Sequence, residues 1–193
     1  MRKYVLSLGK VAIGAAVLAT VPSAMATVLN FDDLPDGVVA ANYGGLDWST
    51  AGWIAFSTPA APYTAKSGDG RITNDFQGSD AASLIRFGTS GQTARFDGAY
   101  FAGLGGALLS FELLLKGQVV ATSATLDPSA TPTFLASGYA GQIDAVRIKS
   151  QNHGEFVMDD FSFTQAVPEP QTYALLLAGL VVVARVARRK ASV

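Results

Sequence analysis

The sequence contains no cysteine, so neither disulfide bonds nor thiolate metal sites contribute to this protein. It has a single histidine, His153, in the turn-like segment Asn152-His153-Gly154. No Gly-x-Ser-x-Gly elbow accompanies this histidine, and the HExxH, P-loop and GxGxxG-then-helix patterns are also missing. The sequence therefore predicts no catalytic residues and favours a protein that is not an enzyme.

Basic residues are scarce in the middle of the chain. All 15 acidic residues lie between Asp32 and Glu169, whereas only seven of the 14 Lys and Arg residues do, so this part carries a net charge of −8. It has too few cations to neutralise phosphates at high density, which argues against nucleic acid as a partner. The charge is typical of a solvated extracellular surface and leaves carboxylates available for divalent cations.

Residues 1–26 have the three regions of a secretory signal peptide. A positive start precedes an apolar stretch and a small-x-small cleavage site: Arg2, Lys3 and Lys10, then residues 11–21, then Ala24-Met25-Ala26. We expect a signal-peptide helix that engages the export machinery and that signal peptidase removes after Ala26. The Ala-x-Ala site and the short apolar stretch argue against the alternative, a retained N-terminal anchor.

Residues 167–193 combine a proline motif, an apolar run and a basic cluster. In chain order these are Pro168-Glu169-Pro170, the run from Tyr173 to Ala184 with Leu175 and Leu180, and Arg185, Arg188, Arg189 and Lys190. This order resembles the PEP-CTERM sorting signal of bacterial surface proteins, which a membrane protease of the exosortase type recognises at the Pro-Glu-Pro. The resemblance implies export, this protease as a partner, and delivery to the cell envelope or the extracellular space.

The apolar run predicts a C-terminal transmembrane helix that anchors the protein in the membrane before processing. The uninterrupted run is shorter than the roughly 20 residues of a comfortable span, but Arg185 can extend its guanidinium to the interface. With the basic cluster on the cytoplasmic side, the body lies outside. The alternative, a buried core helix, is disfavoured by four cations so close to its end.

Residues 27–166 form the body and hold no long segment of helical periodicity. Short apolar and aromatic runs recur between turn signals, which predicts an all-β, antiparallel β-sandwich domain. The runs are 28–31, 54–56, 83–87, 107–115, 118–126, 143–150 and 156–163. Lys116-Gly117 predicts a tight hairpin turn. The alternation of Val146 and Ile148 with Arg147 and Lys149 predicts a strand with one buried face.

Four motifs along the body follow one another as they do in many exported PEP-CTERM proteins. They are Phe31-Asp32-Asp33-Leu34, residues 42–48, residues 96–101 and residues 156–161. Their order resembles jelly-roll β-sandwiches of the carbohydrate-binding type. The resemblance implies a jelly-roll-like fold more than a particular ligand, because one sandwich hosts many functions.

Two acidic pairs bracket the body: Asp32-Asp33 after the first predicted strand, and Asp159-Asp160 entering the last. Terminal strands often lie close in a jelly roll, and Ca²⁺ takes six to eight oxygen ligands, so the four carboxylates are candidates for a structural calcium site. The alternative is that these aspartates bond nearby backbone amides in turns. Both readings stay open at this point. The acidic segment Gly68-Asp69-Gly70 is read as a turn.

Aromatic residues in the loop-rich first third suggest a sugar site. They are Tyr43, Trp48, Trp53 and Tyr63. Exposed rings stack on sugar faces, but large aromatics also fill cores, and Trp48 is the best candidate for a buried residue.

The sequence favours a non-enzymatic, exported protein of the cell envelope or extracellular matrix, associated with exopolysaccharide or biofilm, as the family resemblance implies. One alternative is a carbohydrate-binding module with a defined sugar site. The other is an extracellular polysaccharide hydrolase, because glycosidase chemistry needs only two suitably spaced carboxylates.

Overall fold

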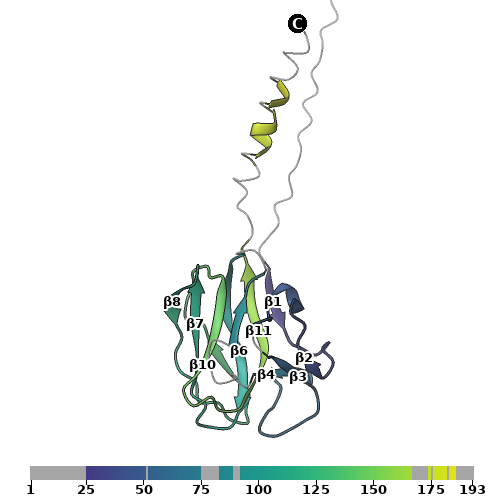
Figure 1. Cartoon of the computed structure of the whole chain (residues 1–193), viewed down its shortest axis with the longest axis vertical. Coiled ribbons are helices and arrows are strands. Elements are labelled where there is room, and N and C mark those ends of the chain that lie inside the picture. The colour runs from purple at the N-terminus through teal and green to yellow at the C-terminus, as the bar shows by residue number, and fades with distance from the viewer. Residues whose placement is uncertain are drawn as a thin grey trace, which may run out of the picture. The chain divides into compact units, whose positions relative to one another are not determined.

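A computed structural model describes residues 25–50, 52–74, 83–88 and 92–166, together with residues 174, 176–181 and 183–185. The segment Ala24–Pro168 forms one compact unit. It consists of two antiparallel β-sheets (Figure 1) that share a hydrophobic core. The predicted all-β sandwich is confirmed, whereas its jelly-roll character stays a prediction.

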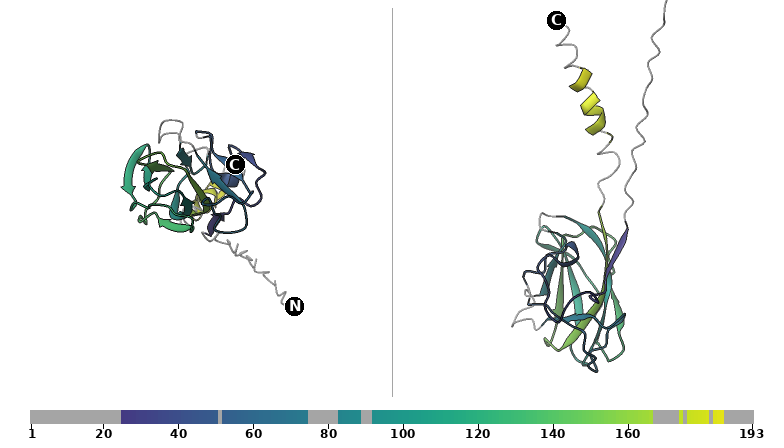
Figure 2. Two further views of the ribbon diagram at one scale, coloured as in Figure 1. Left: turned by 90° about the horizontal axis from the view of Figure 1, so that it is seen from below. Right: turned by 90° about the vertical axis from the view of Figure 1, so that its right-hand side faces the viewer.

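The larger sheet has seven strands in the order β2-β3-β4-β11-β6-β9, with β1 also paired to β11. Their bounds are β1 Ala26–Leu29, β2 Gly37–Val38, β3 Ile54–Phe56, β4 Arg71–Thr73, β6 Ala94–Gly103, β9 Thr133–Ala136 and β11 Phe156–Gln165. Along β11, Met158 pairs with β4, and residues 161–164 pair with β1. The first and last strands therefore lie side by side, as the sequence predicted (Figure 2).

The smaller sheet has four strands in the order β5-β10-β7-β8. Their bounds are β5 Leu84–Arg86, β7 Leu109–Leu115, β8 Gln118–Thr122 and β10 Ala145–Ser150. Lys116 and Gly117 join β7 to β8 with positive φ at both positions, as a two-residue I′ turn requires, so the predicted hairpin is confirmed. The predicted alternation is also confirmed, because Val146 and Ile148 are fully buried while Arg147 and Lys149 are partly exposed.

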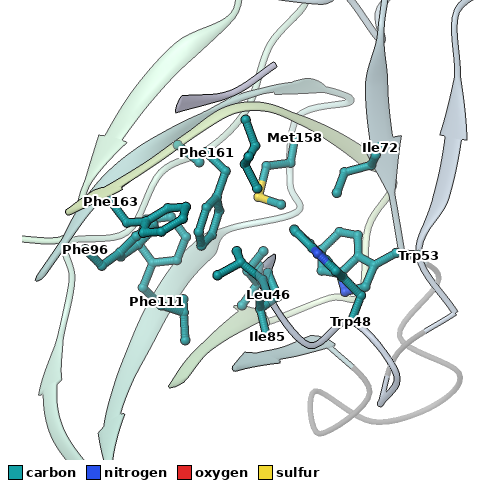
Figure 3. Close-up of a cluster of buried hydrophobic side chains, with 14 of the residues drawn as sticks. Leu46, Trp48, Trp53, Ile72, Ile85, Phe96, Phe111, Met158, Phe161 and Phe163 are labelled. Carbon is teal, nitrogen blue, oxygen red and sulfur yellow. The ribbon is translucent and has the colours of Figure 1, made fainter. Parts of the chain in front are cut away.

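An aromatic cluster fills the space between the sheets (Figure 3). Phe96 of β6 and Phe111 of β7 come from opposite sheets, and their ring centroids lie 4.9 Å apart in an edge-on arrangement. Phe161 of β11 is at the centre of the cluster and meets the rings of Trp48, Phe87, Phe96 and Phe163. Such contacts add to the stabilisation that burial of the rings already provides.

Strand β11 is interrupted by a bulge at Asp159 and Asp160. Its register with β6 shifts between Asp159 and Ser162, and Asp160 has a φ of 47°. Neighbouring side chains of a regular strand point to opposite faces of a sheet, but a bulge can turn both to one side. The sequence predicted that Asp159 and Asp160 enter the last strand. The pair lies inside β11 instead, and the bulge directs both carboxylates to one loop.

Residues 174, 176–181 and 183–185 are helical and exposed. Within the described part of the chain, no helix is long and apolar enough to cross a membrane. The predicted C-terminal transmembrane helix is therefore not found among these residues. The predicted signal-peptide helix lies outside the described residues.

Candidate functional site

The 66–70 loop, Lys66–Gly70, lies against the outer face of the larger sheet and is held at one end by Asp32. The Oδ1 atom of Asp32, in the turn after β1, accepts hydrogen bonds from the N–H groups of Asp69 at 3.0 Å and Gly70 at 2.8 Å. Glycine is needed at position 70, because a Cβ there would lie 2.4 Å from the carbonyl oxygen of Phe31. Asp32 of the first acidic pair is thus tied to a loop that the sequence identified only as a turn.

Asp159 and Asp160 hold the other end of the 66–70 loop. Oδ2 of Asp159 accepts from the N–H groups of Lys66 at 2.7 Å and Ser67 at 2.9 Å. The hydroxyl of Ser67 donates to Asp160 at 2.8 Å. Asp159 is only 2% exposed, and this burial raises the pKa of its carboxyl to about 6, although the N–H groups of Ser67, Asp160 and Lys66 act in the opposite direction.

Asp33, the remaining member of the two pairs, makes a different contact. It accepts a hydrogen bond from the hydroxyl of Tyr43 at 2.6 Å. Burial of Tyr43, together with this bond, raises the pKa of the phenol. Three of the four aspartates therefore converge on one loop, and the fourth fixes the 3-10 turn Tyr43–Gly45.

Asp32 and Asp159 accept hydrogen bonds from backbone N–H groups, as in the alternative that the sequence left open, but the 66–70 loop that supplies them is distant in the sequence. Asp33 and Asp160 accept from side-chain hydroxyl groups instead. Among the described residues, no group of three or more His, Cys, Asp or Glu side chains is arranged to hold a metal ion. The convergence on the 66–70 loop nevertheless keeps several carboxylate oxygens on one side of the sheet. Structural calcium stays a prediction with a direct test.

The calcium hypothesis predicts that millimolar calcium raises the melting temperature of the protein by several degrees. An ion bound only by the folded state stabilises it by about 2.7 kcal/mol at a hundredfold excess over Kd. Thermal unfolding in calcium and then in chelator, for the parent and for Asp160→Asn, measures the effect. A shift that disappears in the variant identifies a ligand. Equal melting temperatures in calcium and in chelator leave the aspartates as hydrogen-bond acceptors alone.

Trp48 and Trp53, two of the candidate sugar contacts, lie in the hydrophobic core. Trp48 is 1% exposed and Trp53 is fully buried, and their rings meet edge-on in the core with centroids 5.9 Å apart. The indole N–H of Trp48 donates to the carbonyl of Tyr43 at 2.8 Å. Tyr43 is half-buried, and its hydroxyl is committed to Asp33. These aromatics stabilise the sandwich, because the loop that carries them folds into the core.

A groove of about 410 Å³ lies on the outer face of the larger sheet, at β3, β4 and the start of β11. We call it the Tyr63 groove and define it by Ile54, Phe56, Tyr63, Thr73, Glu155 and Val157. The hydroxyl of Tyr63 donates to the carboxylate of Glu155, and this bond raises the pKa of Tyr63 to about 12. The sequence singled out Tyr63 but missed Phe56 and Glu155, which no local pattern connects to it.

Most residues of the predicted export and sorting signals lie outside the described part of the chain. They are Ala24, Pro168, Glu169, Pro170, Tyr173, Leu175, Arg188 and Arg189. Ala26 is the first residue of β1, so the predicted cleavage site directly precedes Thr27 in that strand. Leu180 and Arg185 are exposed helical residues.

Comparison with known proteins identifies a motif in the C-terminal segment of the chain. A family model for the PEP-CTERM protein-sorting motif matches residues 166–190. No curated protein and no solved structure matches the chain. The matched residues contain the Pro-Glu-Pro, the apolar run and the basic cluster, so the resemblance noted in the sequence is confirmed. The chain therefore carries a PEP-CTERM sorting motif at residues 166–190, a motif that implies export and processing by an exosortase-type membrane protease.

Proposed function

We propose that this protein is a non-enzymatic component of the cell envelope or extracellular matrix that associates with exopolysaccharide. The observation that carries the proposal is the PEP-CTERM motif at residues 166–190, because it directs the body to the outside of the cell. The net charge of −8 between Asp32 and Glu169 suits a solvated body in that environment.

The contacts of the acidic side chains support a binding role more than a catalytic one. Glu112, which lies on a strand of apolar neighbours, accepts a hydrogen bond from Arg147 at 2.9 Å and lies 3.7 Å from Lys149. Asp32 and Asp159 are committed to the 66–70 loop. A glycoside hydrolase instead needs two carboxyl groups that face one glycosidic bond.

A carbohydrate-binding module with a defined sugar site is the second candidate function. The Tyr63 groove favours it, because an aromatic ring and a carboxylate meet there at an open surface. A matrix protein and a sugar-binding module differ in whether one localised site or the whole surface contacts the polymer.

The proposed function is tested by fractionation of the producing cells. We expect the mature protein to begin at Thr27, to lack the segment after the Pro-Glu-Pro, and to leave the matrix fraction when the polysaccharide is digested. A Pro168→Ala, Pro170→Ala double variant should keep its tail, because the sorting protease loses its recognition motif. Mass spectrometry of both termini measures the result.

Pro35→Ala provides the matched control, because Pro35 is an exposed proline of the body and lies outside the sorting motif. It should be processed like the parent. Intact protein with both Met1 and Val193 at the cell surface would contradict the sorting mechanism. Protein that stays in the matrix after the polysaccharide is removed would contradict the association with polysaccharide.

A further inference from the structure

We propose that the Tyr63 groove binds a neutral sugar unit of a polysaccharide. This inference deepens the proposed function and rests on it for the nature of the polymer.

The floor of the groove is an apolar surface formed by side chains of strand β3, which pairs with β4. Ala55 is buried in the core, so its neighbours Ile54 and Phe56 point to the outer face, where Ile54 is 45% exposed. Thr73 lies opposite Ile54 in the next strand, and its hydroxyl donates to the carbonyl of Phe156 at 2.7 Å. An apolar floor of this kind suits the C–H face of a pyranose ring.

Arg71 fixes the orientation of Phe56. Its guanidinium lies 4.2 Å from the centroid of the Phe56 ring and donates to the carbonyl oxygens of Asp69 at 2.7 Å and Thr58 at 2.5 Å. Arg71 is buried, and burial lowers the pKa of the group. The aromatic part of the floor is thus ordered before any ligand arrives, which reduces the entropy that binding would cost.

The rim supplies the polar groups that a sugar requires. Tyr63 and Glu155 come from different segments, and the bond between them places a phenol ring and a carboxylate side by side. This bond occupies Oε2 of Glu155, and a carboxylate has two oxygens that accept from hydroxyl groups. An apolar floor with a few fixed polar groups at its edge, in a volume of about 410 Å³, has the general character of a small-molecule site.

The charge of the groove selects a neutral sugar over an anionic one. The described residues that line it include His153 but no Lys or Arg, and Glu155 contributes a negative charge at the rim. The surrounding body is also acidic, so uronate or phosphate groups would be repelled. A second hollow of about 290 Å³ shares Tyr63 and leaves room for a chain of more than one unit. Arg71 and Asp69 both line this hollow, and the Arg71 guanidinium donates to the carbonyl oxygens of Asp69 and Thr58.

The test is calorimetric titration of the full-length protein with short neutral glucan, galactan and mannan oligosaccharides, and with an oligogalacturonate. We expect at least one neutral oligosaccharide to bind and the galacturonate to bind more weakly. Tyr63→Ala should weaken binding about tenfold, and Tyr63→Phe, which keeps the ring, should weaken it less. Melting temperatures show that each variant is folded.

Ile54→Arg and Val119→Arg form a matched pair that does not depend on Tyr63. The two side chains have similar exposure, 45% and 49%, but Val119 lies on β8 of the other sheet. Ile54→Arg should block the groove and weaken binding about tenfold or more, whereas Val119→Arg should bind like the parent. Equal binding by both variants, tighter binding of galacturonate, or no binding of any neutral oligosaccharide would overturn the proposal.

Binding of the polysaccharide extracted from the producing cells distinguishes the groove proposal from the broader proposal that the protein associates with exopolysaccharide. If the parent and Ile54→Arg both bind this polymer equally, the groove proposal fails and the association with exopolysaccharide stands. If the parent does not bind the polymer but binds a neutral oligosaccharide, the broader proposal fails and the groove stands.

Discussion

Replacing Phe161 by alanine is expected to lower the free energy of unfolding by about 4 kcal/mol and the melting temperature by roughly 10 °C. Phe161 is fully buried, and its ring lies within 4.7 Å to 6.4 Å, centroid to centroid, of Trp48, Phe87, Phe96 and Phe163. Removal of the ring leaves a cavity that these neighbours fill only in part, so the transfer and cavity contributions add. The substitution should destabilise both sheets, because the aromatic cluster packs between them.

Chemical denaturation of the full-length protein measures this loss, and Phe134→Ala is the matched control. Phe134, on the edge strand β9, is 41% exposed and meets only the ring of Tyr100 among the described aromatics, at 5.1 Å. Its substitution should cost less than about 1 kcal/mol, as surface changes usually do. Equal losses for the two variants would show that the aromatic cluster between the sheets does not dominate the stability of the sandwich.

Asp159→Asn is expected to remove a strongly pH-dependent part of the stability. Burial raises the pKa of Asp159 to about 6 in the folded protein, above the value of about 3.9 in an unfolded chain. The folded state therefore binds the proton more tightly. The stabilising contribution is complete below about pH 4 and is lost as the pH rises through about 6. Between these pH values the free energy of unfolding of the parent should fall by up to about 3 kcal/mol relative to that of the variant.

The measurement is the difference in unfolding free energy between parent and variant at several pH values from about 4 to 7. Other carboxylates contribute equally to the unfolding free energy of parent and variant, so their contributions cancel in this difference. Asp47 is one of them: hydrogen bonds from Ser49 lower its pKa, so its contribution to stability is lost as the pH falls. Asp69→Asn, an exposed position in the same loop, controls for the loss of one negative charge. A difference that stays flat, or that increases in favour of the parent as the pH rises, would contradict the role assigned to Asp159.

The sequence-based prediction of strands succeeded where apolar residues are continuous or alternate. The seven predicted runs contain or overlap β1, β3, β5, β7, β8, β10 and β11. These segments bury side chains in a local pattern, and the pattern is visible without any partner strand. The Lys116-Gly117 turn was predictable for a similar reason, since its backbone requirement falls on two adjacent residues.

The central strand β6 was missed because Asp97-Gly98 interrupts its apolar pattern and looks like a turn. Gly98 has a φ of 146°, and a Cβ at this position would lie 2.3 Å from the carbonyl oxygen of Leu135. The neighbouring strand β11 shifts its register at the same level, where Ser162 pairs with Gly98. This glycine therefore belongs to an irregular part of the sheet, and only the pairing of β6 with β9 and β11 reveals it.

The sequence by itself determined that the protein carries a sorting signal, because the Pro-Glu-Pro and its flanking residues form a linear motif. It also determined the sandwich class, through short runs between turns. Only the tertiary structure decided that Trp48 and Trp53 are core residues, that Asp32 and Asp159 hold one loop, and that Tyr63 meets Glu155 from 92 residues away. These contacts depend on strands β1, β4 and β11 lying together in one sheet, and pairing over such separations leaves no local periodicity in the chain.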